Sequence, residues 1–158
     1  MTKTNRFAAA AVIAGMALTG LAGVAATTPA AAEEPATYTA RFSNTAVGGY
    51  DAVSYFDGQG VEGSKEFATE YEGAEYRFSS AENLARFEAD PARFAPQYGG
   101  YCAWAIAEGK LAPGDPRFAA VHDGKLYLNF NADVQKTWNG DRDGFIARAN
   151  AQWPSILK

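Results

Sequence analysis

The sequence predicts an α+β fold, a compact single domain in which antiparallel hairpins pack with short helices. Two pairs of short, aromatic-containing segments flank the dipeptides Glu72-Gly73 and Asp123-Gly124, a pattern typical of β-hairpins. Capping residues and helical stretches follow each pair. Hairpins mixed with short helices favour an α+β domain over a doubly wound parallel sheet.

Residues 1–32 have the pattern of a secretory signal peptide. A short basic region with Lys3 and Arg6 precedes an uncharged run rich in Ala and Gly, and small residues then precede the acidic Glu33. A retained membrane helix is the alternative, but the run is only mildly apolar and a cleavage site follows it. We therefore expect a periplasmic or secreted protein that has no membrane association after cleavage.

Residues 33–45 contain Ala and Pro without a clear period, which predicts a linker or loose N-terminal arm before a domain over 46–158. We expect no internal repeat in that domain. A short strand is expected over 51–56. The first hairpin then joins residues 66–71 to residues 74–79. Ser79, at the end of that hairpin, or Ser80 can cap the helix that follows.

The second half of the domain is expected to begin with a short helix over 101–108, which follows the glycine pair Gly99-Gly100. The second hairpin joins 118–122 to 125–130 across its Asp-Gly turn. Asn131 can cap the next helix. A last amphipathic helix is expected over 143–153, ahead of a proline.

Composition limits the chemistry. The formal net charge is −4, and cleavage would also remove two basic residues, so the mature domain lacks the basic footprint of a nucleic-acid binder. Both methionines lie within residues 1–32, so the mature domain has no thioether donor. Its soft metal donors are then limited to its single Cys, Cys102, and its single His, His122. A hydrolase triad has no support, because no nucleophile-elbow pattern surrounds a Ser.

Several motifs recur in a known arrangement. They are Gly49-Tyr50-Asp51-x-Val53-x-Tyr55-Phe56, Tyr76-x-Phe78, Asn83, Phe87, Asp90-Pro91, Phe94 and Tyr98-Gly99-Gly100-Tyr101-Cys102. With these motifs the chain resembles the YHS domain family, and in particular the exported YHS domain-containing (seleno)proteins. The resemblance covers about 46–153, and it implies a YHS-like fold and an association with a copper or zinc ion.

The chain departs from the metal-linked members of that family at their three cysteines. The resemblance places these on Ser54, Ser79 and Asn83, so all three thiolates are absent. Soft metals prefer thiolate, thioether or imidazole donors. The remaining metal-ligand candidates are therefore Cys102 and His122.

Each candidate has a structural alternative. Cys102 stands near a helix start, where amides can stabilise a thiolate, but an isolated Cys is by default a small buried hydrophobe. His122 stands at a hairpin tip, where a surface role is common. The candidate pocket residues also have structural alternatives. Aromatic side chains mostly fill cores, and Asp commonly accepts hydrogen bonds from backbone amides in turns. These residues are Tyr50, Asp51, Tyr98, Tyr101 and Trp104.

We expect an exported YHS-type binding module rather than an enzyme, holding a metal ion or a small ligand near Cys102. The alternative is a thiol redox protein in which an external reductant restores Cys102, since no resolving Cys exists. An interaction domain for another exported protein is a third possibility. A homodimer linked through Cys102 is also open, because two copies could share their thiolates around one ion.

Overall fold

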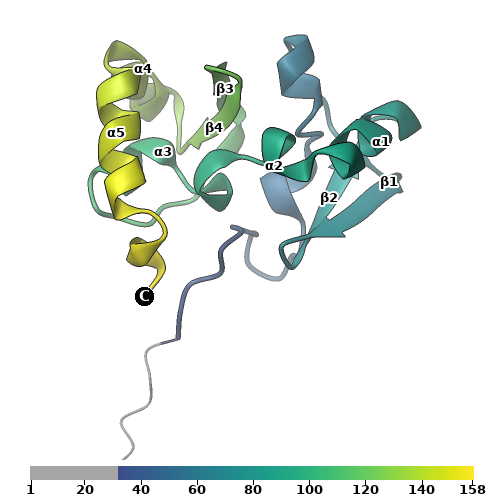
Figure 1. Cartoon of the computed structure of the whole chain (residues 1–158), viewed down its shortest axis with the longest axis horizontal. Coiled ribbons are helices and arrows are strands. Elements are labelled where there is room, and N and C mark those ends of the chain that lie inside the picture. Colours follow the sequence, from purple (N-terminus) through teal and green to yellow (C-terminus); the bar gives the residue numbers. More distant parts are fainter. Residues whose placement is uncertain (1–31) are drawn as a thin grey trace, which may run out of the picture. The chain divides into compact units, whose positions relative to one another are not determined.

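The computed structural model describes residues 32–158, so the predicted signal peptide lies outside the described residues except for its last position. Figure 1 shows two β-hairpins, each followed by helices. The α+β prediction is confirmed. Within the described residues, no helix combines the length and the apolar character that crossing a membrane requires.

Two similar sets of elements make up the domain. The first contains the 3₁₀ helices η1 (Ala46–Gly49) and η2 (Ser54–Asp57), strands β1 (Ser64–Tyr71) and β2 (Ala74–Phe78), and helices α1 (Ala81–Ala89) and α2 (Pro91–Phe94). The second contains η3 (Gln97–Gly100), α3 (Ala103–Ala107), β3 (Asp115–His122), β4 (Lys125–Asn129), α4 (Ala132–Gly140) and α5 (Arg142–Gln152), and η4 (Ser155–Leu157) follows. The strands form two separate antiparallel pairs, β1 with β2 and β3 with β4.

Both predicted hairpins are confirmed. The turn residues Glu72 and Gly73 have φ values of 48° and 77°, and Asp123 and Gly124 have values of 49° and 71°. Positive φ at both central residues is the signature of a type I′ turn, whose twist matches the flanking strands. Acidic residues followed by Gly therefore set both turns.

The strand predicted over 51–56 is wrong. The segment instead turns into η2, because the Asp51 carboxylate accepts hydrogen bonds from the backbone amides of Val53 (2.9 Å) and Ser54 (3.2 Å). A side chain that captures the next amides in this way initiates a helical turn and competes with strand pairing. The apolar residues Ala52 and Val53, which suggested a strand, are both buried with 0% exposure.

The helix caps largely follow the prediction. Ser80 caps α1 by accepting a hydrogen bond from the amide of Asn83 (3.1 Å), and Asn131 caps α4 by accepting one from the amide of Val134 (2.9 Å). The last helix, α5, begins one residue before the predicted start, with Asp141 as its cap. A side-chain oxygen at this position satisfies an amide that has no partner within the helix.

The expectation of no internal repeat is wrong. Residues 48–94 align without a gap onto residues 99–145, and we call these segments the first and the second repeat. Pairs of identical residues include Gly48/Gly99, Gly49/Gly100, Tyr50/Tyr101, Phe67/Phe118, Gly73/Gly124, Tyr76/Tyr127, Asp90/Asp141 and Phe94/Phe145.

The backbone repeats with the sequence. Gly48 and Gly99 have φ values of 58° and 59°, and the residues before them, Val47 and Tyr98, have 52° and 56°. Both hairpins have the same register with an irregularity at the same place, after Ser64 in one and after Asp115 in the other. This agreement in turns, register and caps shows that the domain consists of two copies of one hairpin–helix unit.

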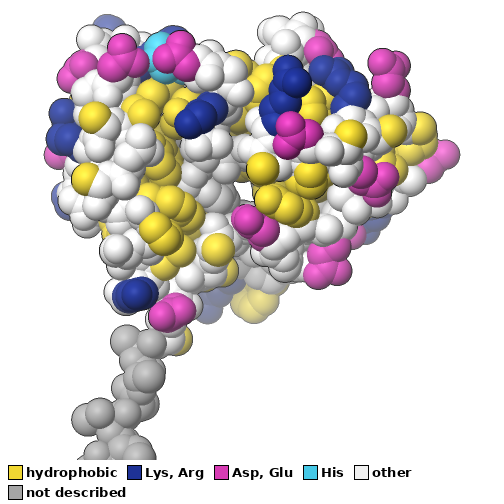
Figure 2. All heavy atoms as spheres, in the orientation of Figure 1, with side chains coloured by type: hydrophobic (Ala, Val, Ile, Leu, Met, Phe, Trp, Pro, Cys, Tyr) yellow, Lys and Arg dark blue, Asp and Glu magenta, His cyan; other side chains and the backbone are white. Residues whose placement is uncertain are grey.

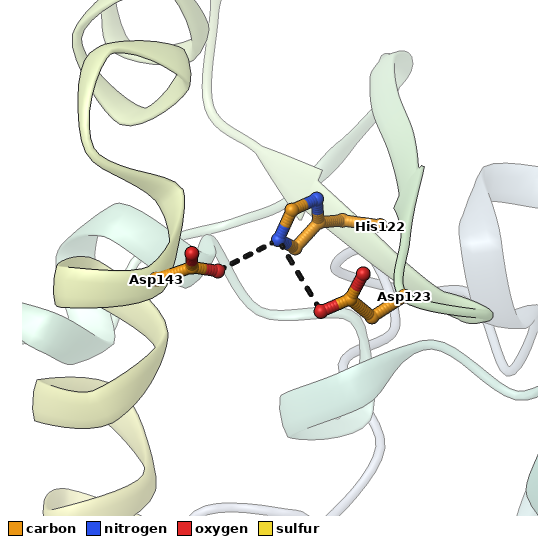
Figure 3. Close-up of side chains that lie close together, drawn as sticks. All are labelled: His122, Asp123 and Asp143. Carbon is orange, nitrogen blue, oxygen red and sulfur yellow. Dashed lines mark hydrogen bonds and ion pairs between the residues drawn. The ribbon is translucent and has the colours of Figure 1, made fainter.

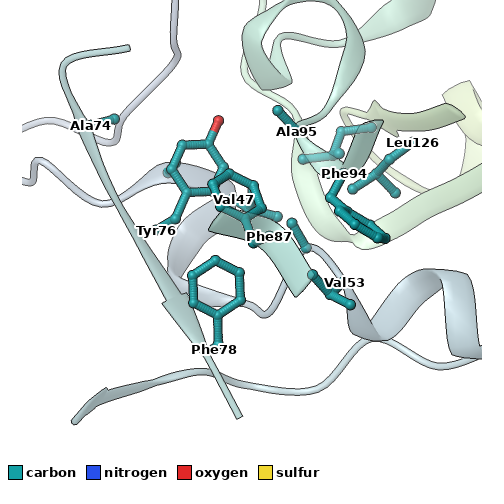
Figure 4. Close-up of a cluster of buried hydrophobic side chains, with 12 residues drawn as sticks. Val47, Val53, Ala74, Tyr76, Phe78, Phe87, Phe94, Ala95 and Leu126 are labelled. Atoms are coloured by element: carbon teal, nitrogen blue, oxygen red, sulfur yellow. The ribbon is translucent and has the colours of Figure 1, made fainter. Parts of the chain in front are cut away.

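The hydrophobic core has two clusters that the repeats share unequally. In the first, Phe87 stacks on Tyr76 at 4.8 Å between ring centroids and lies against Phe78 at 4.9 Å (Figure 4). Leu126 and Leu128, which β4 contributes from the second repeat, are buried in the same cluster. The repeats are therefore joined through a common core. The second cluster gathers around Trp138 of the second repeat and also includes Tyr98, Ala149 and Leu157.

The predicted arm, residues 33–45, lies against the domain. Its backbone amides at Glu34 and Tyr38 donate hydrogen bonds to the carbonyls of Leu157 (2.8 Å) and Gly99 (2.9 Å). The Tyr101 hydroxyl donates a hydrogen bond to a carbonyl of the arm at 2.9 Å. These contacts bring the arm to the start of the second repeat.

Candidate functional site

A buried polar network surrounds Asp51, which has 0% exposure. In addition to the two amides of η2, its carboxylate accepts hydrogen bonds from the amide (2.9 Å) and hydroxyl (2.7 Å) of Ser79 and from Nδ2 of Asn83 (2.7 Å). The hydroxyl of Ser54 donates to the Asp51 carbonyl at 2.7 Å. Five donors on one carboxylate leave it fully satisfied, as buried charges require.

The network contains all three positions at which the family resemblance places cysteines. Ser54, Ser79 and Asn83 converge on Asp51, so the fold retains the convergence while replacing every thiolate. Hydroxyl and amide groups are poor donors for a soft metal, and here they already bond to Asp51. The residues present do not fit a soft metal ion, and Asp51 serves the fold rather than an open pocket.

Cys102 is the counterpart of Asp51 in the second repeat, and its side chain has 0% exposure. Burial raises the pKa of the Cys102 thiol, and three backbone amides partly oppose that rise, those of Ala105, Phe130 and Trp104. They are the counterparts of the three residues whose amides bond to the Asp51 carboxylate. The sulfur therefore occupies the equivalent amide-lined position, which is buried in both repeats.

This environment does not favour chemistry at the sulfur. The Cys102 Sγ lies 4.0 Å from Oδ1 of the buried Asn129. A buried thiol with a raised pKa is a weak nucleophile, because the thiolate is the reactive species. In the folded domain the sulfur is also out of reach of a second copy. The geometry favours a packing role for Cys102 over redox cycling or a shared thiolate site.

His122 lies in a cluster of metal-ligand side chains. Its Nε2 is 2.8 Å from Oδ1 of Asp143 and 3.8 Å from Oδ2 of Asp123 (Figure 3). One potential ligand atom from each of the three residues lies within 4.8 Å of the others. The side chain of His122 is 22% exposed, whereas those of Asp123 and Asp143 are 85% and 86% exposed. We call these three residues the His122 cluster.

Three neighbouring elements position the cluster. His122 ends β3, Asp123 begins the hairpin turn, and Asp143 lies in the first turn of α5. The ring of His122 lies at 6.3 Å from the buried ring of Trp138, nearly perpendicular to it. Sequence reasoning selected His122 but missed both carboxylates. Asp123 follows it directly, whereas no local pattern signals Asp143, which the packing of α5 brings near.

The cluster does not include Cys102. His122 pairs with Lys125 in the β3–β4 ladder, whereas Cys102 forms a bridge with Leu128. Three residues along a strand correspond to about 10 Å. The sequence prediction that Cys102 and His122 serve as metal ligands therefore divides: the fold places His122 beside two carboxylates and Cys102 in the core.

The five predicted pocket residues do not meet in one cavity. Tyr50 lines a cavity of about 500 Å³, Tyr98 one of about 300 Å³ and Tyr101 one of about 290 Å³. Asp51 is buried in its network, and Trp104 packs against the second core cluster. The physical reason is the repeat: its two Gly-Gly-Tyr turns carry the predicted residues to different places.

Comparison with known proteins identifies a family for the first repeat. A family model for the YHS domain matches residues 52–98. No significant match is found among the curated proteins or the solved structures. The matched segment contains the Ser54, Ser79 and Asn83 network, whereas Cys102 and His122 lie in the second repeat beyond it.

Proposed function

We propose that this chain, whose residues 52–98 match the YHS domain model, is an exported binding module that associates with a divalent metal ion at the His122 cluster. The observation that carries this proposal is the convergence of one imidazole and two carboxylates within 4.8 Å. No comparable set of Cys, His, Asp and Glu ligands is present elsewhere in the part of the chain that the structure describes.

The donor set favours zinc-like ions. Zn²⁺ accepts His nitrogen and Asp oxygen atoms as ligands, and three protein ligands leave a further position for water or another ligand. Copper(I) would lack the thiolate or thioether donors that it prefers. Both carboxylates are highly exposed, so the ion should exchange readily with solvent, as a binding or delivery role requires.

Zinc titration of the untagged protein tests the proposal. We expect one Zn²⁺ per chain by isothermal titration calorimetry, and a loss of about tenfold or more in affinity for His122→Asn and for Asp143→Asn, because each substitution removes one of three ligands. The matched control is Asp133→Asn. This exposed residue occupies the first turn of α4, as Asp143 does in α5, but it lies outside the cluster.

Two results would contradict the metal proposal. The first is wild-type protein that binds no zinc at millimolar concentration. The second is equal zinc binding by the wild type and by His122→Asn, which would show that the ion binds outside the His122 cluster. Circular dichroism of each variant would establish that the fold is retained.

Export is the second part of the proposal, and the pattern of residues 1–32 supports it. We expect the protein recovered from the periplasm or the medium of a bacterial host to begin at Glu33. N-terminal sequencing and intact mass measure this directly. Protein that keeps Met1 and stays in the membrane fraction would show that the segment is a retained anchor.

A further inference from the structure

A cavity lies at the place in the first repeat that corresponds to the His122 cluster of the second repeat. Tyr71, Glu72 and Ala92 are the counterparts of His122, Asp123 and Asp143, and all three line a cavity of about 300 Å³. In the first repeat, the hairpin turn and the second helix therefore both contribute to a cavity wall. In the second repeat the corresponding residues are the candidate metal ligands, two of which are highly exposed.

Three of the twelve residues that line the cavity are aromatic. Tyr98 and Trp153 line it together with Tyr71, and the rings of Tyr98 and Trp153 lie 5.9 Å apart at an angle of 66°. The Tyr98 hydroxyl donates a hydrogen bond to the side-chain oxygen of Asn150 (2.9 Å), and the carbonyl of Ile146 lies 3.4 Å from it. This part of the wall is therefore held in place before any ligand binds.

The cavity carries negative charge. Glu72 is the one charged side chain among the residues that line it, within the described part of the chain. Burial, and then the neighbouring charge of Glu72, raise the pKa of the Tyr71 hydroxyl. Glu72 sits in the tight turn with φ of 48°, which holds its backbone beside Tyr71. Figure 2 shows hydrophobic and acidic side chains side by side around the hollow of the face that it draws.

We propose that this cavity binds a small organic ammonium ion of the choline class. Aromatic faces attract a quaternary ammonium through the ring quadrupole, and a carboxylate beside them adds charge pairing. A cavity of about 300 Å³ is at the lower end of the range for small-molecule sites, which suits a ligand of this size. The site goes beyond the proposed metal function and uses none of the His122 cluster.

A matched pair of ligands tests the charge requirement. Choline and its neutral isostere 3,3-dimethyl-1-butanol have nearly the same shape, so they differ mainly in charge. In NMR titrations with EDTA present, which removes any contribution of the metal site, we expect choline to bind at least about tenfold more tightly than the isostere. Glu72→Gln should lower the affinity for choline and leave that for the isostere unchanged.

Glu70→Gln is the control variant, because Glu70 is a nearby acidic residue of β1 that does not line the cavity. Its choline affinity should equal that of the wild type. Equal binding of choline and the isostere would overturn the proposal in favour of a neutral apolar ligand. Failure of choline to bind at tens of millimolar, or unchanged binding by Glu72→Gln, would overturn the site itself.

Discussion

Replacing Asp51 with alanine is expected to lower the free energy of unfolding by about 3 kcal/mol or more, because it leaves several buried hydrogen-bond donors without an acceptor. The substitution would leave the side chains of Ser79 and Asn83 and three backbone amides without their acceptor in the core. Buried donors without partners cost more than the hydrogen bonds themselves contribute. Most of the expected loss of stability therefore comes from the buried donors that are left unsatisfied, and less from the lost hydrogen bonds themselves.

Urea denaturation followed by tryptophan fluorescence measures this loss. Asp57→Ala is the matched control, because Asp57 is an exposed carboxylate that pairs with Arg86 at 2.7 Å. An exposed ion pair contributes at most about 1 kcal/mol, so the control should be nearly neutral. If Asp51→Ala lowered stability by no more than Asp57→Ala, the network would not hold the start of the first repeat in place.

The hairpins and caps could be predicted because their signals are local. The Glu72-Gly73 and Asp123-Gly124 dipeptides specify type I′ turns, and Asn131 specifies a helix start, whatever the rest of the chain does. The segment after Asp51 could not be predicted correctly. Its apolar residues suggest a strand, whereas the Asp51 carboxylate accepts hydrogen bonds from the amides of Val53 and Ser54. Donors from Ser79 and Asn83, far along the chain, hold that carboxylate in place.

The repeat was missed because its identities fall mainly on small and turn-forming residues. Asp51 and Cys102 occupy equivalent positions, yet one is charged and the other is a thiol, and Ser79 corresponds to Phe130. The signal that could have revealed the repeat is the recurrence of Gly-Gly-Tyr and of an acidic residue with Gly at one constant spacing. Substitutions in a core are tolerated when the overall volume is kept, so the two repeats can share one fold although many of their residues differ.

In the candidate site, too, only the residues with local signals could be predicted from the sequence. His122 could be selected from its single occurrence, and Asp123 adjoins it, but Asp143 reaches the site only through the docking of α5. Solvent access to Cys102 could not be deduced from a helix start alone. The same sequence position can present a side chain to solvent or to the core, and here the bridge to Leu128 places it in the core.

Raising the pH from 8 to 11 is expected to destabilise the domain strongly, because buried tyrosines cannot ionise in the folded state. Burial is the main cause that raises the pKa of Tyr76, Tyr98 and Tyr55 far above the ordinary value of 10. The charge of Glu72 adds to the effect at Tyr76, and that of Tyr127 at Tyr98. For Cys102, burial raises the thiol pKa in the same direction.

The sign follows from linkage. A group whose pKa is higher in the folded state stabilises the fold below its unfolded pKa, and this contribution is lost as the pH rises toward the folded pKa. By pH 11 each fully buried tyrosine should remove about 1.4 kcal/mol, so Tyr76 and Tyr98 alone should remove about 3 kcal/mol. That is a large share of the stability of a typical domain. The loss from Cys102 should begin earlier, near pH 9.

Thermal unfolding at pH 8, 9, 10 and 11, together with tyrosinate absorbance, separates these contributions. Tyr98→Phe should flatten the dependence of stability on pH between 10 and 11, because one group no longer ionises on unfolding, while Cys102→Ala should flatten it between 9 and 10. Each variant is compared with its own value at pH 8, which cancels the loss of packing or of the Tyr98 hydrogen bond. A melting temperature that stays constant to pH 11 would mean that these hydroxyls ionise in the folded protein, and the two buried clusters would then be open to water.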